Sequence, residues 1–221
     1  CALPIFAWID RAGILQIGPQ SAGADPGPVC YQQGGIEPTV TDANVVLGRI
    51  GSDRAIGRHS DWSFDREGAA TAIQNAIAKP LGMSNIEAAW AILQVANDRI
   101  AASIRLMTVE RGHDPRDFAL VAYGGGGPLH ACAVLRELEI SKALIPAWPG
   151  ITSAFGCITA DIRHDFVRSL NVQLDDIELS DFYAVLDKQV VEGCETVKEE
   201  CEDIASLDIV YEADMAYEGQ V

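Results

Sequence analysis

The densest chemical signal in the sequence is the run Gly124, Gly125, Gly126 and Gly127, which follows an apolar segment and precedes Pro128. Glycine has no Cβ and a free choice of φ, so this run lets the backbone approach a ligand closely. The N–H groups of a helix opened by Pro128 would point toward the same spot, which suits a phosphate or a ribose. The alternative is a turn that only lets a helix pack tightly on a sheet. The pattern alone leaves both interpretations open, because it matches neither a Walker A loop nor a dinucleotide fingerprint.

Four other side chains are candidates for a substrate or nucleotide cleft. His130 follows Pro128 closely and either faces the same pocket or packs as a structural histidine. Asp42 places a carboxylate at the start of a predicted helix, where it either caps the helix or faces a ligand. Ser21 and Asp25 lie in a stretch of glycine, proline and other small residues that could line a cleft or lie flat against another element. No serine-hydrolase elbow or metal-ligand spacing is present, so catalytic residues and metal ligands stay unassigned.

The elements that must position the first of these residues are short. The pattern predicts a hairpin over 7–17, a long loop over 18–38 and a polar connection over 52–68. Between them we expect a helix that opens at Thr41 or Asp42 and closes near Gly51. The long loop is predicted because glycine and proline are too dense over 18–38 to sustain a regular element.

From residue 85 onward, helices and strands alternate, which favours an α/β fold. The clearest helix covers 85–111, where Ser84 and Glu87 match a capping box. Its apolar stripe is predicted to be Ile86, Trp90, Leu93, Ile100, Ile104 and Met107. Further helices are expected over 128–138, from Thr152 or Ser153, and over 180–205, and strands over 118–123, 143–146, 165–174 and 209–217.

Composition and charge exclude several classes of protein. Apolar residues make up 48% of the 221 residues, with no stretch long enough for a transmembrane helix. Of the net charge of −16, residues 171–221 carry −13, because they hold 15 acidic and two basic side chains. Nucleic acid and an anionic membrane surface are therefore poor partners. The six cysteines show no paired spacing, so we expect free thiols and a cytoplasmic location.

Several of these segments together resemble the hydantoinase A/5-oxoprolinase family. The resemblance begins with the segments 18–28 (GPQSAGADPGP) and 38–44 (PTVTDAN), followed by Leu47-Gly48-Arg49. It continues through 110–115 (ERGHDP), the segment 118–123 with its four glycines, and 128–131 (PLHA). It ends near 213–220, and thus covers nearly the whole chain.

The resemblance implies part of the second lobe of an actin-like ATPase fold, the fold of the sugar-kinase, actin and heat-shock-protein superfamily. In that fold, residues 124–127 match a segment that contacts adenosine. The family includes ATP-dependent hydrolases of cyclic amides, such as 5-oxoproline and hydantoins, and subunits of ketone carboxylases. Both phosphorylate an amide or enol oxygen, with ATP and, we expect, Mg²⁺. A hydantoinase B-type subunit or domain commonly completes the reaction.

The chain also departs from the family pattern. Residues 1–6 do not resemble the family's glycine-rich stretch, and the phosphate-binding Asp-Gly-Gly-Thr segments do not occur. We therefore expect an internal fragment, with an ATPase-like domain over 1–170 and the start of an acidic α+β region over 171–221. The expected function is that of a cyclic amidase, inactive as a fragment. The alternatives are a ketone carboxylase subunit or a non-catalytic binding module.

Overall fold

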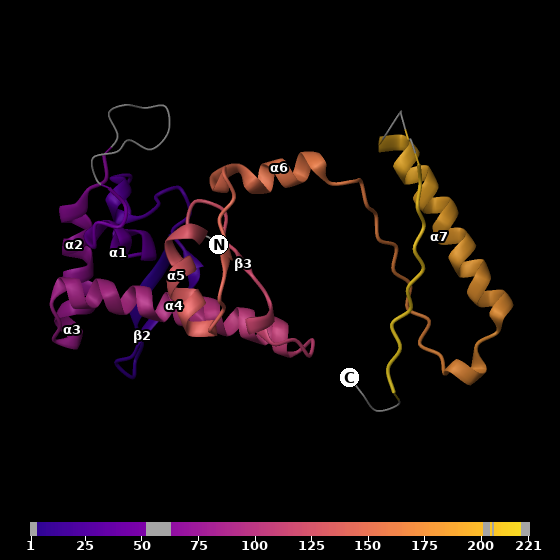
Figure 1. The fold of residues 1–221 in the computed structure, drawn as a ribbon, viewed down its shortest axis with the longest axis horizontal. Helices are drawn as coiled ribbons and strands as arrows, with labels where there is room; N and C mark the ends of the chain where they lie inside the picture. Colours follow the sequence, from indigo (N-terminus) through magenta and orange to yellow (C-terminus); the bar gives the residue numbers. More distant parts are fainter. Residues whose placement is uncertain (1–3, 52–62, 201–203, 205, 218–221) are drawn as a thin grey trace. The chain divides into compact units, whose positions relative to one another are not determined.

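The computed structural model describes residues 4–51, 63–200, 204 and 206–217. The chain divides into two compact units, residues 1–158 and 159–221, and each is considered by itself. The first unit contains every candidate site residue (Figure 1). The predicted change of domain at residue 170 stays a prediction.

The first unit begins with the expected hairpin. Strand β1, Ile5–Ile9, pairs antiparallel with β2, Leu15–Ser21, so that β2 extends into the segment predicted to be a loop. In the turn, the Asp10 carboxylate accepts hydrogen bonds from the N–H groups of Ala12 and Ile14, each at 2.9 Å. The bond from Ile14 and those from Gln16 and Ala12 lower the pKa of Asp10, because they stabilise its charged form.

Two helical segments follow the hairpin. Helix α1, Val40–Val46, ends earlier than predicted, before Gly48 turns the chain at a φ of +69°. The sequence analysis did not predict the next helix, which runs as α2, Arg66–Ile73, a π-helical turn, Gln74–Ala78, and α3, Lys79–Leu81. Part of the predicted polar connection, 52–62, lies outside the described residues.

Helix α4, Asn85–Val109, is confirmed together with its capping box. The Glu87 N–H donates to Ser84 Oγ at 3.3 Å, and the Ser84 N–H donates to Glu87 Oε2 at 2.8 Å. The predicted apolar stripe is wrong in part, because Trp90 and Met107 are 51% and 64% exposed. The buried face consists instead of small and branched residues that allow close packing against α1 and the hairpin: Ala88, Ala89, Ile92, Leu93, Ala96 and Ala101.

A parallel strand pair follows α4. Strand β3, Leu120–Val121, pairs with β4, Ala143–Leu144, and the crossover contains helix α5, Gly127–Leu138. Both strands are shorter than predicted, and they are not fully buried: Val121 is 49% and Leu144 59% exposed. Helix α5 packs on α4 through a small apolar cluster formed by Ala101, Val134, Leu138 and Ile140 (Figure 1). The α/β class is thereby confirmed.

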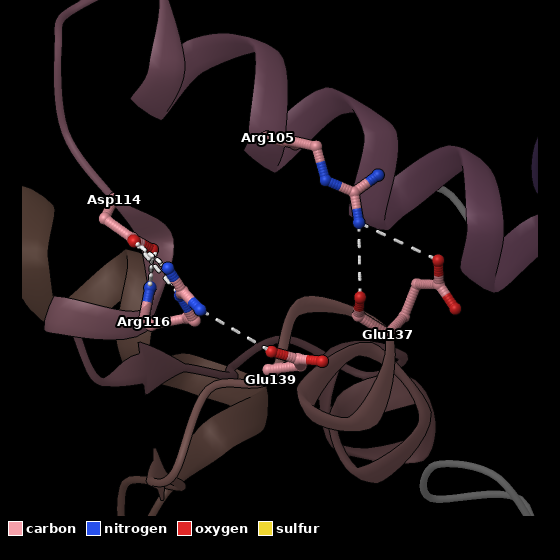
Figure 2. Close-up of polar contacts among 5 residues, drawn as sticks. All are labelled: Arg105, Asp114, Arg116, Glu137 and Glu139. Carbon is pink, nitrogen blue, oxygen red and sulfur yellow. Dashed lines mark hydrogen bonds and ion pairs between the residues drawn. The ribbon is translucent and has the colours of Figure 1, made fainter.

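Exposed ion pairs hold the C-terminal end of α5 near α4 and the loop after it (Figure 2). Arg116 contacts Asp114 at 2.6 Å and Glu139 at 3.8 Å, and Arg105 contacts Glu137 at 3.8 Å. The Arg116 guanidinium, which donates hydrogen bonds to the carboxylate of Asp114, lowers the pKa of that group to about 2. Surface pairs of this kind contribute little to stability. They lie at the C-terminal end of α5, whereas the glycine run lies at its N-terminal end.

After β4, the chain forms helix α6, Thr152–Thr159, which starts where the sequence predicts. In the second unit, helix α7, Leu179–Glu200, is also confirmed. The amide of its Gln189 donates to the backbone carbonyl of Phe166 at 2.8 Å. The predicted strands 165–174 and 209–217 are wrong, since no strand forms over these described residues. An alternating pattern is therefore not sufficient for a strand, which also requires paired backbone hydrogen bonds.

Candidate functional site

Gly124, Gly125 and Gly126 form the turn between β3 and α5, and Gly127 is the first residue of the helix. Gly124 has a φ of +79°, and its N–H donates to the Pro149 carbonyl at 2.6 Å. Gly125 is exposed, and among the described residues, apart from the immediate chain neighbours, no atom lies within 4 Å of the position that a Cβ would take at Gly124 or Gly125. The positive φ and the open space together explain why glycine suits this turn.

The start of α5 lacks a side-chain cap. Its N-cap residue, Gly126, has no side chain to accept from the first turn, and Pro128 has no N–H. The first turn uses one backbone bond, from the Leu129 N–H to the Gly126 carbonyl at 3.1 Å. An uncapped helix start carries a partial positive charge. The turn at 124–127 therefore offers an anionic group an open backbone surface beside this charge.

His130 lies one turn into α5 and is buried, at 4% exposure. Its Nδ1 lies 2.6 Å from Oδ1 of Asn97 on α4. Burial lowers the pKa of His130, and the charge of Arg49 lowers it further, because both disfavour the protonated ring. His130 is thus a neutral imidazole at neutral pH, with the proton on Nδ1 donated to Asn97.

Arg49 connects α1 to the same turn of α5. Its guanidinium donates to the Leu129 carbonyl through Nη2 and to Asn44 Oδ1 through Nη1, the latter at 3.0 Å. Asn44 in turn donates to the Val40 carbonyl at 2.9 Å. The sequence analysis noted Leu47-Gly48-Arg49 as a motif and assigned it no role. No spacing signal could have found this contact, because 80 positions separate Arg49 from Leu129.

A cavity of about 210 Å³ lies beside His130. Its walls come from the hairpin, the start of α1, the middle of α4 and the first turn of α5: Ile5, Ile17, Gly18, Pro19, Val40, Ala96, Arg99, Ile100, Ser103 and His130. Most of this lining is apolar. The Arg99 guanidinium donates to the Ile17 carbonyl and to Gln16 Oε1, the latter at 2.7 Å. The sequence analysis missed Arg99 and Ser103, which it treated only as parts of a helix.

Asp42 is fully buried, and its interactions are structural. The prediction that Thr41 or Asp42 is the N-cap of α1 is wrong, because Thr39 is the N-cap and Asp42 the third helical residue of a capping box. The Asp42 carboxylate accepts hydrogen bonds from the N–H groups of Val29, Cys30 and Thr39 and from the Thr39 hydroxyl. Burial, and then the charge of Asp42, raise the pKa of the Cys30 thiol.

Ser21, the last residue of β2, and Asp25, in the loop that follows, are both exposed. Ser21 Oγ accepts from the Gly23 N–H at 3.2 Å, and neither side chain lines the cavity. Of the candidates from the sequence, only His130 lines it. The glycine turn lies at the start of the same helix but outside the cavity lining.

The described part of the chain holds no group of three or more histidine, cysteine, aspartate or glutamate side chains placed to bind a metal. Cys30, Cys132, Cys157 and Cys194 are free thiols, as expected. No helix among the described residues is long and apolar enough to cross a membrane.

The first unit is thus an α/β structure. Its helix α5 starts at a glycine turn after a parallel strand and contains the buried His130. The family model of hydantoinase/oxoprolinase matches residues 4–166, and the chain belongs to this family. The resemblance seen in the sequence is thereby confirmed.

Named relatives include enzymes of two kinds. The caprolactamase alpha subunit of Pseudomonas jessenii is 44% identical over 77% of this chain and 24% of its own. The acetophenone carboxylase gamma subunit of Aromatoleum aromaticum is 36% identical over 98% of this chain and 30% of its own. The chain thus spans less than a third of these relatives.

Two solved structures share the fold. The ATP-dependent caprolactamase of P. jessenii matches with a TM-score of 0.67 and 39% identity, over 90% of this chain and 29% of that one. A nucleotide-free acetone carboxylase, from work on ATP-dependent acetone carboxylation, matches with a TM-score of 0.66 and 32% identity, over 72% of this chain and 22% of that one. The two TM-scores are nearly equal, whereas the identity and the share of this chain that is covered are higher for the caprolactamase.

Proposed function

We propose that this chain is part of an ATP-dependent hydrolase of cyclic amides that activates the substrate carbonyl by phosphorylation. The observation that carries the proposal is the 44% identity to a caprolactamase alpha subunit. An amide carbonyl is a poor electrophile, and transfer of a phosphoryl group to its oxygen creates a good leaving group. The relatives are named as subunits, which supports a separate partner, here of the hydantoinase B type.

The glycine turn is the part of this chain that we assign to ATP, as part of an actin-like lobe. The surface at Gly124 and Gly125 is open, and the α5 start beside it is uncapped, so both fit a nucleotide. ATP would supply the phosphoryl group, and Mg²⁺ would shield its charge. The residues of this chain would bind and orient the nucleotide. The glycine turn would let it approach the backbone, and Arg49 holds α5 in place by donating to the Leu129 carbonyl.

The test uses the natural full-length protein with its partner subunit. We expect caprolactam or 5-oxoproline to stimulate ATP hydrolysis. Gly125→Val places a side chain in open space, where it meets no atom of the chain but blocks a ligand, so KM for ATP rises about tenfold or more. Gly156→Val is the matched control, because Gly156 is also exposed with open space around it. Failure of every lactam to stimulate hydrolysis, with both subunits folded, refutes the proposal.

A second candidate function is that of a ketone carboxylase subunit. Its specific support is the acetophenone carboxylase gamma subunit, whose similarity extends over 98% of this chain and so includes the second unit. Incorporation of labelled bicarbonate into an added ketone, dependent on ATP, would establish this function in place of the first. If calorimetry detects no nucleotide binding and Gly125→Val changes nothing, a non-catalytic module is the remaining interpretation.

A further inference from the structure

The cavity beside His130 has the size of a small-molecule site. Its volume of about 210 Å³ lies below the range of about 300–1,000 Å³ that is usual for sites of drug-sized ligands. This space accommodates one small ring and is far too small for a nucleotide. Its apolar wall is made by Ile5, Ile17, Val40 and Ile100, which favours a ligand with a hydrocarbon body.

Three polar side chains line the cavity: Arg99, Ser103 and His130. The guanidinium of Arg99 donates to two neutral acceptors on β2, the Ile17 carbonyl and the Gln16 side chain, so part of its hydrogen-bonding capacity is already used. The Ser103 hydroxyl donates to the Arg99 carbonyl at 2.9 Å. His130 is more than nine-tenths buried, and its Nδ1 is occupied by Asn97. Nε2 has no hydrogen-bond partner among the described residues, and the ring lines the cavity.

The protonation state of His130 decides what Nε2 can recognise. Because burial and Arg49 lower the pKa of this histidine, the ring is neutral at neutral pH. With the proton on Nδ1, Nε2 carries a lone pair and accepts a hydrogen bond. A ligand must therefore present an N–H or O–H donor to satisfy it.

We propose that this cavity binds a lactam, a compact neutral ring whose amide N–H donates to Nε2 of His130. A ketone of the same size has no such donor, so the cavity favours cyclic amides over ketones. The choice of a lactam among small N–H rings rests on the proposed function. The acceptor role of Nε2 rests on the contact of Nδ1 with Asn97 Oδ1 and on the burial that keeps the ring neutral, and not on the proposed function.

The experiment compares ε-caprolactam with N-methylcaprolactam, which has lost the N–H. Binding to the natural full-length protein with its partner subunit is measured by calorimetry without ATP. We expect the wild type to bind caprolactam about tenfold more tightly than the N-methyl analogue, which is the typical effect of one buried hydrogen bond. His130→Phe keeps the ring shape and should reduce this ratio to about one. Met107→Leu, on the exposed face of the same helix α4 and outside the cavity lining, should leave it unchanged.

A second variant tests the same hydrogen bond without removing the histidine. Asn97→Asp places a carboxylate on Nδ1 and favours the protonated ring, so Nε2 becomes a donor. The ratio should then fall below that of the wild type, because the donor on Nε2 suits a carbonyl and repels an N–H. An unchanged ratio in both His130→Phe and Asn97→Asp, or a wild type that binds neither ring, overturns the proposal.

The pocket and the proposed function can fail separately. If caprolactam stimulates ATP hydrolysis and His130→Phe leaves its KM unchanged, the function stands and the pocket is overturned. If caprolactam binds selectively through His130 while no lactam stimulates hydrolysis, the pocket stands and the amidase function is overturned.

Discussion

The buried carboxylate of Asp42 should be essential for stability rather than for ligand binding. It joins two pieces of backbone that are apart in the sequence: the 3-10 helix Val29–Tyr31, and helix α1 with its N-cap Thr39. Oδ1 accepts from the Cys30 N–H at 2.8 Å, whereas Oδ2 accepts the other three hydrogen bonds. Asp42→Asn keeps the shape of the side chain and changes only one of the two oxygens to a donor.

The loss of unfolding free energy on this substitution depends on how the hydrogen bonds are shared between Oδ1 and Oδ2. The less costly orientation places the new NH₂ at Oδ1, where it loses the bond from Cys30 and faces that N–H. Loss of one bond to a charged acceptor costs about 1.5–3 kcal/mol, and an unsatisfied buried donor costs about 1–3 kcal/mol. We therefore expect a loss of about 3 kcal/mol, which raises the hydrogen-exchange rate of residues 26–47 by about 150-fold.

The assay is hydrogen exchange followed by mass spectrometry on the natural full-length protein. Asp25→Asn is the matched control, because Asp25 is exposed, and its effect should stay within about 0.5 kcal/mol. The reasoning fails if Asp42→Asn changes exchange no more than the control does. If the variant kept normal stability and lost ATP hydrolysis, a role of Asp42 at a ligand would be restored.

Three further predictions concern α5 and its surroundings. Glu139→Gly should stabilise the protein by about 1 kcal/mol in thermal unfolding, because Glu139 ends α5 at a φ of +54°, which costs any residue but glycine. The pKa of His130 in the folded protein lies below its ordinary value of 6.5, so the neutral ring stabilises the fold fully above about pH 6.5 and this stabilisation is lost as the pH falls below that value. His130→Phe should therefore flatten the acidic part of a profile of unfolding free energy against pH. An unchanged slope would contradict this assignment. Arg116→Gln should raise the pKa of Asp114 from about 2 toward 3.8 in a carbon NMR titration, with Arg105→Gln as a control that leaves it unchanged.

Local signals in the sequence were sufficient for the starts of α4 and α6 and for the glycine turn. The capping box of Ser84 and Glu87 was readable because its bonds span only three positions. The start of α1 was misplaced by two residues, since Thr39, Thr41 and Asp42 are all suitable caps and the choice depends on the buried bonds to residues 29 and 30. The helix after Asp65 was missed, although Asp65 caps it and Gly82 ends it.

Tertiary contacts decided what the sequence could not predict. Trp90 was expected in the core because it is large and apolar, but the packing face of α4 consists largely of alanines that fit close to α1. The cavity was not predictable, because its walls come from segments between residues 5 and 130. His130 was a candidate from its position in α5, whereas Asn97, which orients it, lies 33 positions earlier and shows no motif.

The short parallel pair β3–β4 has a consequence for handling the protein. Each of the two strands pairs with one other strand in the described part of the chain and is two residues long, which restricts backbone pairing at its outer side and leaves the exposed side chains as the main source of attraction. Val121 and Leu144 add exposed apolar surface to these edges. The chain expressed by itself should therefore self-associate through this segment. Lysine at Val121 or at Leu144, which discourages edge pairing, is the change to make first when the isolated chain precipitates.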